Sequence, residues 1–311
     1  MNRKAIINRY FQRKEQLLVS NKNYEQQVLG LFDWVAEADQ VENDLTIKTL
    51  MFRKMGTAAI VSKQEGIAAG IEEIMFLLSK RTEITVVTHV VDGKPVSKGE
   101  ILLTLRGENR DLLAFERIIL NILARMSGIA TYTNSFLSKL ETIKNPPFLA
   151  ATRKTPWMLL DKKAVAVGGG LTHRLNLSDF PLVKDNYLEV IKKEENISLQ
   201  EAIRKALKRF SSSFFEIEVR NILEFQAIMQ SLEKKKDCPL AIMLDNFELK
   251  SVMEQMEEIK KQPLYKHLII EASGEITEQN LLHWAKTGVD LISIGALTHS
   301  SPTFNISMKI Q

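Results

Sequence analysis

Residues 214–246 read "FFEIEVRNILEFQAIMQSLEKKKDCPLAIMLDN", with a short apolar run at each end and a longer segment of helical spacing between them. Short apolar runs rich in Ile, Val and Leu are typical of strands that are buried on both faces. The segment between the runs has the periodicity of an amphipathic helix. Strand, helix and strand in this order predict a βα unit, in which the two strands lie parallel.

The same alternation continues on both sides of this stretch. Further apolar runs that end in polar residues occur at residues 148–154, 180–186, 268–274 and 290–296. Helical segments fill several of the gaps, at residues 198–210, 248–261 and 277–288. Repeated units of this kind favour a closed βα barrel over an open parallel sheet, although the periodicity alone is compatible with both.

The first 110 residues follow a different pattern. Residues 23–39 have helical spacing, and residues 57–80 are typical of a strand, a turn and a helix. Residues 82–107 are typical of strands broken at the turn signals DGKP and KGE. Strands beside helices without regular alternation predict an α+β layer, so the chain as a whole is predicted to be of the α/β class.

The composition excludes several classes of protein. Of the 311 residues, 45% are hydrophobic and 26% charged, as in ordinary soluble globular proteins. The net charge of +4 is not gathered into an arm, and the runs at 192–195 and 233–237 are typical of solvated helix ends, so no nucleic-acid partner is expected. The single cysteine, Cys238, excludes an internal disulfide and a cysteine zinc cluster. No signal peptide or membrane-length apolar run is found, and we expect a cytoplasmic protein without a membrane partner.

Polar or small residues stand at the end of every predicted strand. In a βα barrel these carboxyl ends form the active site. The residues concerned are Arg153, Lys154, Lys184, Asp185, Glu218, Asp245, Ser273, Gly274, Gly295 and Ala296. A single charged residue at a strand end is usually only solvated, but the recurrence at each strand indicates a site.

These residue types indicate a particular chemistry. Carboxylates such as Glu218 and Asp245 can hold Mg²⁺, which commonly bridges to substrate phosphates. The small-residue turns at Gly274 and Gly295 can present backbone N–H groups to a phosphate. Arginine and lysine bind further anionic groups, and arginine can bind a carboxylate through two hydrogen bonds. The sequence therefore predicts a phosphorylated, Mg²⁺-bound substrate and a second substrate that carries carboxylates.

Eight segments between roughly residues 112 and 300 carry a resemblance to a known family. They are FERIILNILARMSGIAT, TRKT, AVAVGGGLTHRLNLSD, LVKDN, EIEV, IMLDNF, EASGEIT and TGVDLISIGALTHS. In this order they resemble the quinolinate phosphoribosyltransferase family. The resemblance implies an N-terminal α+β sandwich domain at residues 1–115, with the tail 300–311 packed on it, and an incomplete, seven-stranded βα barrel at residues 116–299. It also implies a homodimer with shared active sites.

The resemblance further implies roles for individual residues. Quinolinate-binding residues are implied to be Arg153, His173, Arg174 and Lys184, with Arg117 reaching in from the neighbouring subunit. The catalytic residues are implied to be Lys154, which contacts phosphoribosyl pyrophosphate, and Glu218 and Asp245, which hold Mg²⁺ and face the ribose. The residues implied to bind the 5′-phosphate are Ser273, Gly274, Gly295 and His299. By the same analogy, the glycines at 168–170 turn the chain beneath the substrate.

The implied activity is Mg²⁺-dependent transfer of phosphoribosyl from phosphoribosyl pyrophosphate to quinolinate. It gives nicotinate mononucleotide, CO₂ and pyrophosphate, a step of de novo NAD biosynthesis. Displacement of pyrophosphate develops positive charge on the sugar and negative charge on the leaving group, which the predicted carboxylates, lysine and metal can stabilise. No general base is required.

Four departures from the family pattern leave two alternatives open. Ala151 replaces an aspartate, PWMLL at 156–160 is about two residues shorter than the family loop, Tyr187 replaces a histidine, and NDLT at 43–46 replaces a Gly-Asp segment. One alternative is a phosphoribosyltransferase paralogue that acts on nicotinate or another anionic acceptor. The other is a catalytically silent, ligand-binding or scaffolding relative. The charged residues implied for the pocket and the metal are all present, which favours an active enzyme.

Overall fold

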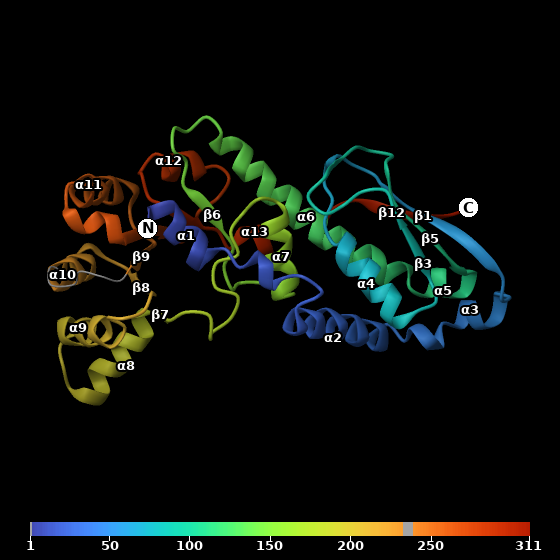
Figure 1. Cartoon of the computed structure of the whole chain (residues 1–311), viewed down its shortest axis with the longest axis horizontal. Helices are drawn as coiled ribbons and strands as arrows, with labels where there is room; N and C mark the ends of the chain where they lie inside the picture. Colours follow the sequence, from blue (N-terminus) through green and yellow to red (C-terminus); the bar gives the residue numbers. More distant parts are fainter. Residues whose placement is uncertain (1, 233–238) are drawn as a thin grey trace. The chain divides into compact units, whose positions relative to one another are not determined.

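The computed structural model describes residues 2–232 and 239–311 (Figure 1). The predicted charge run at 233–237 and Cys238 lie outside these residues. The chain forms two compact units, each assembled from three segments: unit 1 from 1–13, 136–153 and 171–296, and unit 2 from 14–135, 154–170 and 297–311. These units are interleaved along the chain more finely than the predicted domains, so the predicted boundary near residue 115 stays a prediction.

Unit 1 is built on a parallel sheet. Its described strands are β6 (Phe148–Ala150), β7 (Leu182–Val183), β8 (Phe215–Val219), β9 (Leu240–Asp245), β10 (Leu268–Ser273) and β11 (Leu291–Ser293), in the order β6-β11-β10-β9-β8-β7. The helices that follow these strands are α8 (Asp185–Glu195), α9 (Leu199–Arg209), α10 (Ile222–Leu232), α11 (Leu249–Lys260), α12 (Leu281–Ala285) and α13 (Ala296–His299), with a 3-10 turn at Pro263–His267. The predicted strands and helices are thus confirmed in type and order, and the apolar runs of β8, β9 and β10 are buried along almost their whole length. The strand predicted at 180–186 is shorter, since β7 comprises Leu182 and Val183.

The expected seventh strand is not formed among the described residues. Its place beside β6 is taken by Leu171, which makes a single parallel bridge to Ala150. The chain leaves the extended conformation two residues later, where His173 adopts a φ of 54°. The sheet therefore has six strands and one bridging residue in the part of the chain that the structure describes.

The amino ends of the strands are closed by helix α1 (Arg3–Phe11). The side chain of Asn2 caps this helix by accepting a hydrogen bond from the backbone N–H of Ala5, at 2.8 Å. The buried face of α1 then packs on the first residues of several strands. The apolar core at this end comprises Ile6, Ile7, Phe11, Ala150, Leu171, Phe180, Phe214, Ala241, Ile269 and Leu291.

The interior face of the sheet changes character along each strand. Because side chains two residues apart point to the same face, Ile269, Glu271 and Ser273 lie in a line along β10. Leu291 and Ser293 do the same along β11, and Ser293 donates a hydrogen bond to Glu271. The interior thus passes from an apolar layer, through a buried polar layer, to the carboxyl ends where the predicted site residues stand.

Unit 2 is built on an antiparallel sheet of the order β12-β1-β5-β3, within the described residues. Its strands are β1 (Met55–Ser62), β3 (Thr85–Thr88), β5 (Ile101–Glu108) and β12 (Ile306–Ile310), and β2 (Gly66–Ile67) pairs separately with β4 (Pro95–Val96). Its helices are α2 (Lys22–Ala38), α3 (Leu45–Leu50), α4 (Ile71–Arg81), α5 (Asn109–Ala114), most of α6 (Glu116–Leu140) and α7 (Leu159–Val167), with 3-10 turns at Lys14–Gln16 and Val41–Asn43. The predicted α+β layer is therefore confirmed.

The C-terminal segment is fixed to α6 at a glycine. The backbone N–H of Phe304 donates to the carbonyl of Ala124, at 3.0 Å. A Cβ atom on Gly128 would lie 2.2 Å from the carbonyl oxygen of Pro302, so only glycine admits the segment at this distance. From there the chain runs into β12, which pairs antiparallel with β1.

Candidate active site

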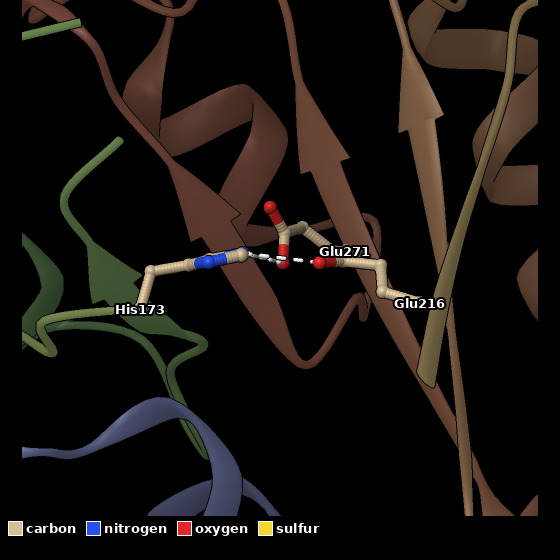
Figure 2. Close-up of side chains that lie close together, drawn as sticks. All are labelled: His173, Glu216 and Glu271. Atoms are coloured by element: carbon tan, nitrogen blue, oxygen red, sulfur yellow. Dashed lines mark hydrogen bonds and ion pairs between the residues drawn. The ribbon is translucent and has the colours of Figure 1, made fainter. Parts of the chain in front are cut away.

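A buried histidine and two buried glutamates form the centre of the polar layer in unit 1 (Figure 2). The Nε2 atom of His173 lies 3.2 Å from an oxygen of Glu271 on β10 and 3.3 Å from an oxygen of Glu216 on β8. His173 is 5% exposed, and both glutamates are fully buried. One imidazole therefore joins two strands that are separated by β9.

Local structure fixes the ring of His173. Its backbone N–H donates to the carbonyl of Phe11, at 2.8 Å, and its ring contacts the ring edge of Phe11 at a centroid distance of 4.9 Å. The backbone N–H of Arg174 donates to Nδ1, at 2.8 Å. Nδ1 therefore faces the backbone N–H of Arg174, and Nε2 faces the two carboxyl groups. Both ring nitrogens of His173 are thus engaged by protein groups.

The two glutamates have opposite pKa shifts. Burial raises the pKa of Glu216 to about 8, and the negative charge of Glu271 adds to this effect. Burial also acts to raise the pKa of Glu271, but the interaction with His173 and the hydrogen bond from Ser293 outweigh it, so that this pKa is lowered. Burial lowers the pKa of His173, whereas the two carboxyl groups raise it and prevail. These shifts favour the charged form of Glu271 and the protonated form of Glu216.

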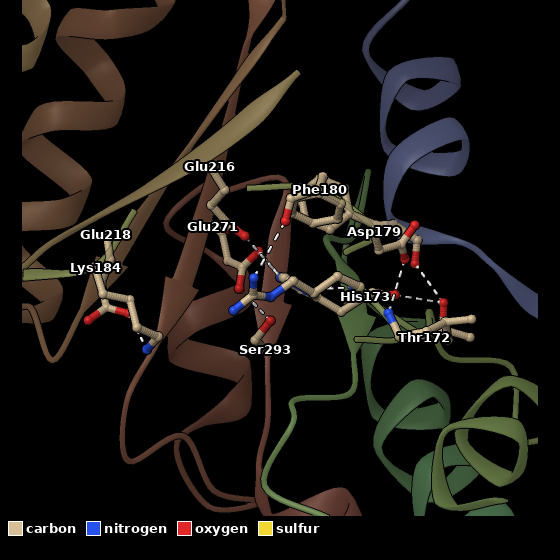
Figure 3. A network of polar contacts seen from close by, with 12 residues as sticks. Thr172, His173, Asp179, Phe180, Lys184, Glu216, Glu218, Glu271 and Ser293 are labelled. Carbon is tan, nitrogen blue, oxygen red and sulfur yellow. Dashed lines mark hydrogen bonds and ion pairs between the residues drawn. The ribbon is translucent and has the colours of Figure 1, made fainter. Parts of the chain in front are cut away.

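The predicted metal ligand Glu218 lies one step closer to the carboxyl ends than Glu216 (Figure 3). Glu218 follows Glu216 by two residues on β8 and so lies on the same face, where it is 6% exposed. Its Oε2 accepts a hydrogen bond from Nζ of Lys184, at 2.8 Å. Asp245 ends the neighbouring strand β9 and is half-buried, and its Oδ2 accepts from Nδ2 of Asn246, at 3.0 Å.

Two of the predicted acceptor-binding cations repel each other. Arg174 is 6% exposed, and its Nη1 makes one long hydrogen bond to the carbonyl of Phe180, at 3.4 Å. Burial lowers the pKa of Arg174, and the positive charge of the exposed Arg153 lowers it further. An anion bound between these two arginines would relieve both costs.

The predicted phosphate-binding turn after β10 is tightly packed. Gly274 has a φ of 96°, a conformation that favours glycine, and a Cβ atom there would lie 2.2 Å from Oδ1 of Asn246. The backbone N–H of Asn246 donates to the carbonyl of Ser273, at 2.9 Å. This turn therefore joins the ends of β9 and β10, so that Asp245 and Ser273 end side by side.

Apart from Gly295, which follows β11 in unit 1, the remaining predicted site residues belong to unit 2. Arg117 is exposed near the start of α6, and Lys154 is exposed at the start of the loop that leads to α7. His299 ends α13 and is exposed, with Nδ1 2.6 Å from the hydroxyl of Ser300. The predicted residues thus fall into one group in unit 1 and another in unit 2, and only the first group is seen together in one sheet.

A second buried acidic cluster, in unit 2, has a structural explanation. Tyr24 donates to Glu73 at 2.7 Å, and Nζ of Lys163 donates to Glu72 at 2.7 Å and to the carbonyl of Leu17 at 2.8 Å. Burial raises the pKa of Glu73 to about 7. Lys163 therefore supplies one positive charge to this cluster.

Family models settle what kind of chain this is. The C-terminal domain of quinolinate phosphoribosyl transferase matches residues 129–309, and the N-terminal domain matches residues 44–127. The chain belongs to the quinolinate phosphoribosyltransferase family. The resemblance inferred from the eight sequence segments, and the α/β fold it implied, are confirmed.

Individual relatives of this quinolinate phosphoribosyltransferase family agree over almost the full length. The chain is 37% identical to a probable nicotinate-nucleotide pyrophosphorylase (carboxylating) of Archaeoglobus fulgidus over 255 residues, which are 81% of this chain and 93% of the relative. It is 34% identical to the protein of the same name from Methanothermobacter thermautotrophicus over 278 residues, 88% of this chain and 95% of the relative. The solved structure of the nicotinate-nucleotide pyrophosphorylase from Francisella tularensis superimposes with a TM-score of 0.78 at 29% identity, covering 92% of this chain and 96% of that one.

Two buried glutamates of this quinolinate phosphoribosyltransferase family member were not predicted as site residues. Glu216 and Glu271 each stand within a run of otherwise apolar strand residues, FEIEV and LIIEAS. A carboxylate inside a buried strand needs a partner, so this pattern was the available signal.

Among the described residues, none of the helices combines the length and apolar character that crossing a bilayer requires.

Proposed function

We propose that this chain transfers phosphoribosyl from phosphoribosyl pyrophosphate to quinolinate, giving nicotinate mononucleotide, CO₂ and pyrophosphate. Its relatives include proteins named nicotinate-nucleotide pyrophosphorylase (carboxylating) and quinolinate phosphoribosyltransferase (decarboxylating). The observation that carries the proposal is the composition of the carboxyl ends of the sheet. There, the carboxylates of Glu218 and Asp245 lie on neighbouring strands, and two mutually repelling arginines belong to the same unit.

The residues suit the two halves of this reaction. When the bond between C1 of the ribose and pyrophosphate breaks, positive charge develops on the sugar, and the carboxylates of Glu218 and Asp245 favour it electrostatically. The pyridine nitrogen of quinolinate then bonds to that carbon. Lys154 stabilises the negative charge that leaves with pyrophosphate. Loss of the 2-carboxylate as CO₂ leaves the electron pair of the broken bond on C2 of the ring. The positive ring nitrogen and the charges of Arg153 and Arg174 stabilise this pair until C2 takes up a proton from water.

We further propose Mg²⁺ as the cofactor. Carboxylate oxygens at neighbouring strand ends suit this ion, which keeps several waters and needs few protein ligands. Asp245 offers a half-buried carboxylate, and Glu218 has one oxygen that does not accept the Lys184 hydrogen bond. When bound, Mg²⁺ would neutralise charge on the leaving pyrophosphate.

In this proposal the acceptor is bound by cationic side chains, and His173 supports one of them without contacting the acceptor itself. Since both ring nitrogens of His173 are engaged by protein groups, its contribution is to hold the backbone of Arg174. Arg153, Arg174 and Lys184 then provide the positive charge for two carboxylates. Quinolinate carries two such groups, and nicotinate carries one.

Tyr187, which stands where the family has a histidine, favours an alternative function in which the acceptor is nicotinate or another anionic acid. Tyr187 lines a cavity of about 810 Å³ beside Arg174, together with apolar residues of β7 and basic residues of α9. The test is to incubate the protein with phosphoribosyl pyrophosphate, Mg²⁺ and either quinolinate or nicotinate, and to measure pyrophosphate and CO₂. Formation of both pyrophosphate and CO₂ from quinolinate would support the proposal. Formation of pyrophosphate without CO₂ would indicate another acceptor. The absence of both products would contradict an enzymatic role.

We also propose a cytoplasmic homodimer with shared active sites. Arg117 is a charged, exposed residue that directly precedes a run of buried residues on α6. An arginine in that position either extends to solvent or serves a neighbouring subunit. Mixing inactive Arg117→Ala protein with inactive Glu218→Ala protein should restore part of the activity through hybrid dimers. No recovery after proven subunit exchange would contradict the shared site.

A further inference from the structure

The loop that carries Lys154 is tied down by a buried carboxylate. Asp161, on α7, is fully buried and receives two hydrogen bonds from Arg125, one from Nε and one from Nη2, each at 2.7 Å. It also accepts from the hydroxyl of Thr155 and from the backbone N–H of Trp157, at 3.2 Å. Four donors on one carboxylate fix the loop between Lys154 and α7 in a single conformation.

The same arginine connects the loop to the segment that contains His299. Nη2 of Arg125 donates to the carbonyl of Thr298, at 2.9 Å, and the hydroxyl of Thr298 donates to the carbonyl of Lys154, at 2.8 Å. Thr298 is fully buried and precedes His299. A closed circuit of hydrogen bonds therefore passes from Asp161 through Arg125 and Thr298 back to the loop.

The circuit also accounts for the shortened PWMLL segment. Trp157, where the family has glycine, donates its N–H to Asp161, and its ring lies 5.5 Å from the guanidinium carbon of Arg125. The tryptophan is thus part of the circuit and extends it by a cation–π contact. The shorter loop is held at Thr155, at Trp157 and at Asp161, so its length alone gives no reason to expect a silent protein.

We propose that Asp161 and Arg125 are positioning residues that set the places of Lys154 and His299 for phosphoribosyl pyrophosphate. The proposal rests on the function proposed above and on the predicted roles of Lys154 and His299. Those two residues are predicted to contact the phosphorylated substrate and not quinolinate. In this proposal Asp161 and Arg125 act through Lys154 and His299, without contacting substrate themselves. Misplacement of a binding group by about 1 Å commonly lowers rates by about 10²-fold.

The first test uses Asp161→Asn, which keeps the size of the side chain and removes its charge. The expected result is a KM for phosphoribosyl pyrophosphate raised by about tenfold or more and a lower kcat, with the KM for quinolinate within about twofold of the parent value. The matched control is Asp33→Asn, which breaks an exposed two-bond pair with Arg81 in the same unit. That control should leave all three constants unchanged. Equal changes in both KM values, or no change, would overturn the proposal.

A second variant keeps the test decisive if Asp161→Asn fails to fold. Thr298→Val preserves the shape of the side chain and removes the hydroxyl that donates to the carbonyl of Lys154, so the expected change is about threefold in the KM for phosphoribosyl pyrophosphate. Calorimetric titration with phosphoribosyl pyrophosphate alone separates the two proposals. If the parent protein binds it but makes no product from quinolinate, the proposed function fails, while weaker binding by the variants still supports the circuit. Unchanged binding of phosphoribosyl pyrophosphate by both Thr298→Val and Asp161→Asn would contradict the positioning role of Asp161 and Arg125.

Discussion

The two ends of the parallel sheet in unit 1 use the same strands for different purposes. At the amino ends, Ala241, Ile269 and Leu291 are buried under α1 in an apolar core. Four residues further along two of these strands, Asp245 and Ser273 face the predicted substrates. Because the alternation of a strand keeps one face inward, a change of side-chain type over four residues separates stability from reactivity.

Between these ends, His173, Glu216 and Glu271 form a layer that is as buried as the core and as polar as the site. Such a layer costs desolvation energy and is tolerated only when its groups satisfy each other. It gives the site a rigid floor. Variants at the three levels should therefore differ in whether turnover, stability or pH dependence changes.

The largest effect is expected at the carboxyl ends. Glu218→Gln and Asp245→Asn should each lower kcat by about 10³-fold, because a preorganised charge opposite the developing sugar cation is lost. Neither change empties the core, so the thermal unfolding midpoint should stay within a few degrees of the parent. Steady-state kinetics and calorimetry would measure the two effects. Near-parent turnover at limiting Mg²⁺ would contradict the proposed metal and catalytic roles.

The amino ends should show the reverse behaviour. Ile7 on α1 is 1% exposed within the core at that end. Ile7→Ala should lower the free energy of unfolding by about 2–5 kcal/mol, through lost burial and the cavity left behind. kcat measured well below the unfolding transition should be unchanged. A fall in kcat without a fall in stability would show that the two ends are not separate.

The strands of this sheet were predictable from sequence because their signal is local. β8, β9 and β10 are apolar runs that end in charged or small residues, so the runs predict both the strand and its functional end. Family resemblance added the roles of Lys154 and Arg117, which no periodicity indicates. Those assignments stay predictions.

What sequence could not give is set by tertiary contacts and backbone conformation. A single bridge at Leu171 replaces the seventh strand because His173 adopts a left-handed backbone conformation. The presence of a histidine in the sequence does not predict this conformation. Asp161 and Arg125 lie 36 residues apart on two helices, and each is individually an ordinary helical residue. Only the fold brings them together.

A smaller effect is expected in the choice of acceptor. Arg153 and Arg174 repel each other, and a dianion relieves this better than a monoanion, which leaves one cation unpaired. Quinolinate should therefore bind at least about tenfold more tightly than nicotinate, and Arg174→Ala should narrow the gap. Calorimetric titration of both acids would measure it. Equal affinities, or tighter nicotinate, would favour the alternative acceptor.

The smallest effect concerns the buried layer and pH. The pKa of Glu216 is raised from 4.5 to about 8, so the folded protein binds this proton more tightly than the unfolded chain. Its stabilising contribution is complete below about pH 4.5 and is lost as the pH rises through about 8. Glu216→Gln mimics the protonated group, and at pH 8 it should have a higher free energy of unfolding than the parent.

Unfolding midpoints of both proteins, measured from pH 5 to pH 9, would test this. The difference between them should grow with pH and level off above about pH 8, once the parent carboxyl is ionised. A difference independent of pH would show that Glu216 is already charged in the folded protein.

The pairing of β12 with β1 has a consequence for how the molecule is made. During synthesis, β1 emerges early, whereas the strand that covers its edge is among the last described residues to be translated. Helix α1 likewise emerges long before β10 and β11, on which it packs. The edge of β1 and the buried face of α1 therefore stay uncovered until these later strands have been translated. Such an uncovered edge and apolar face favour wrong pairing in that interval.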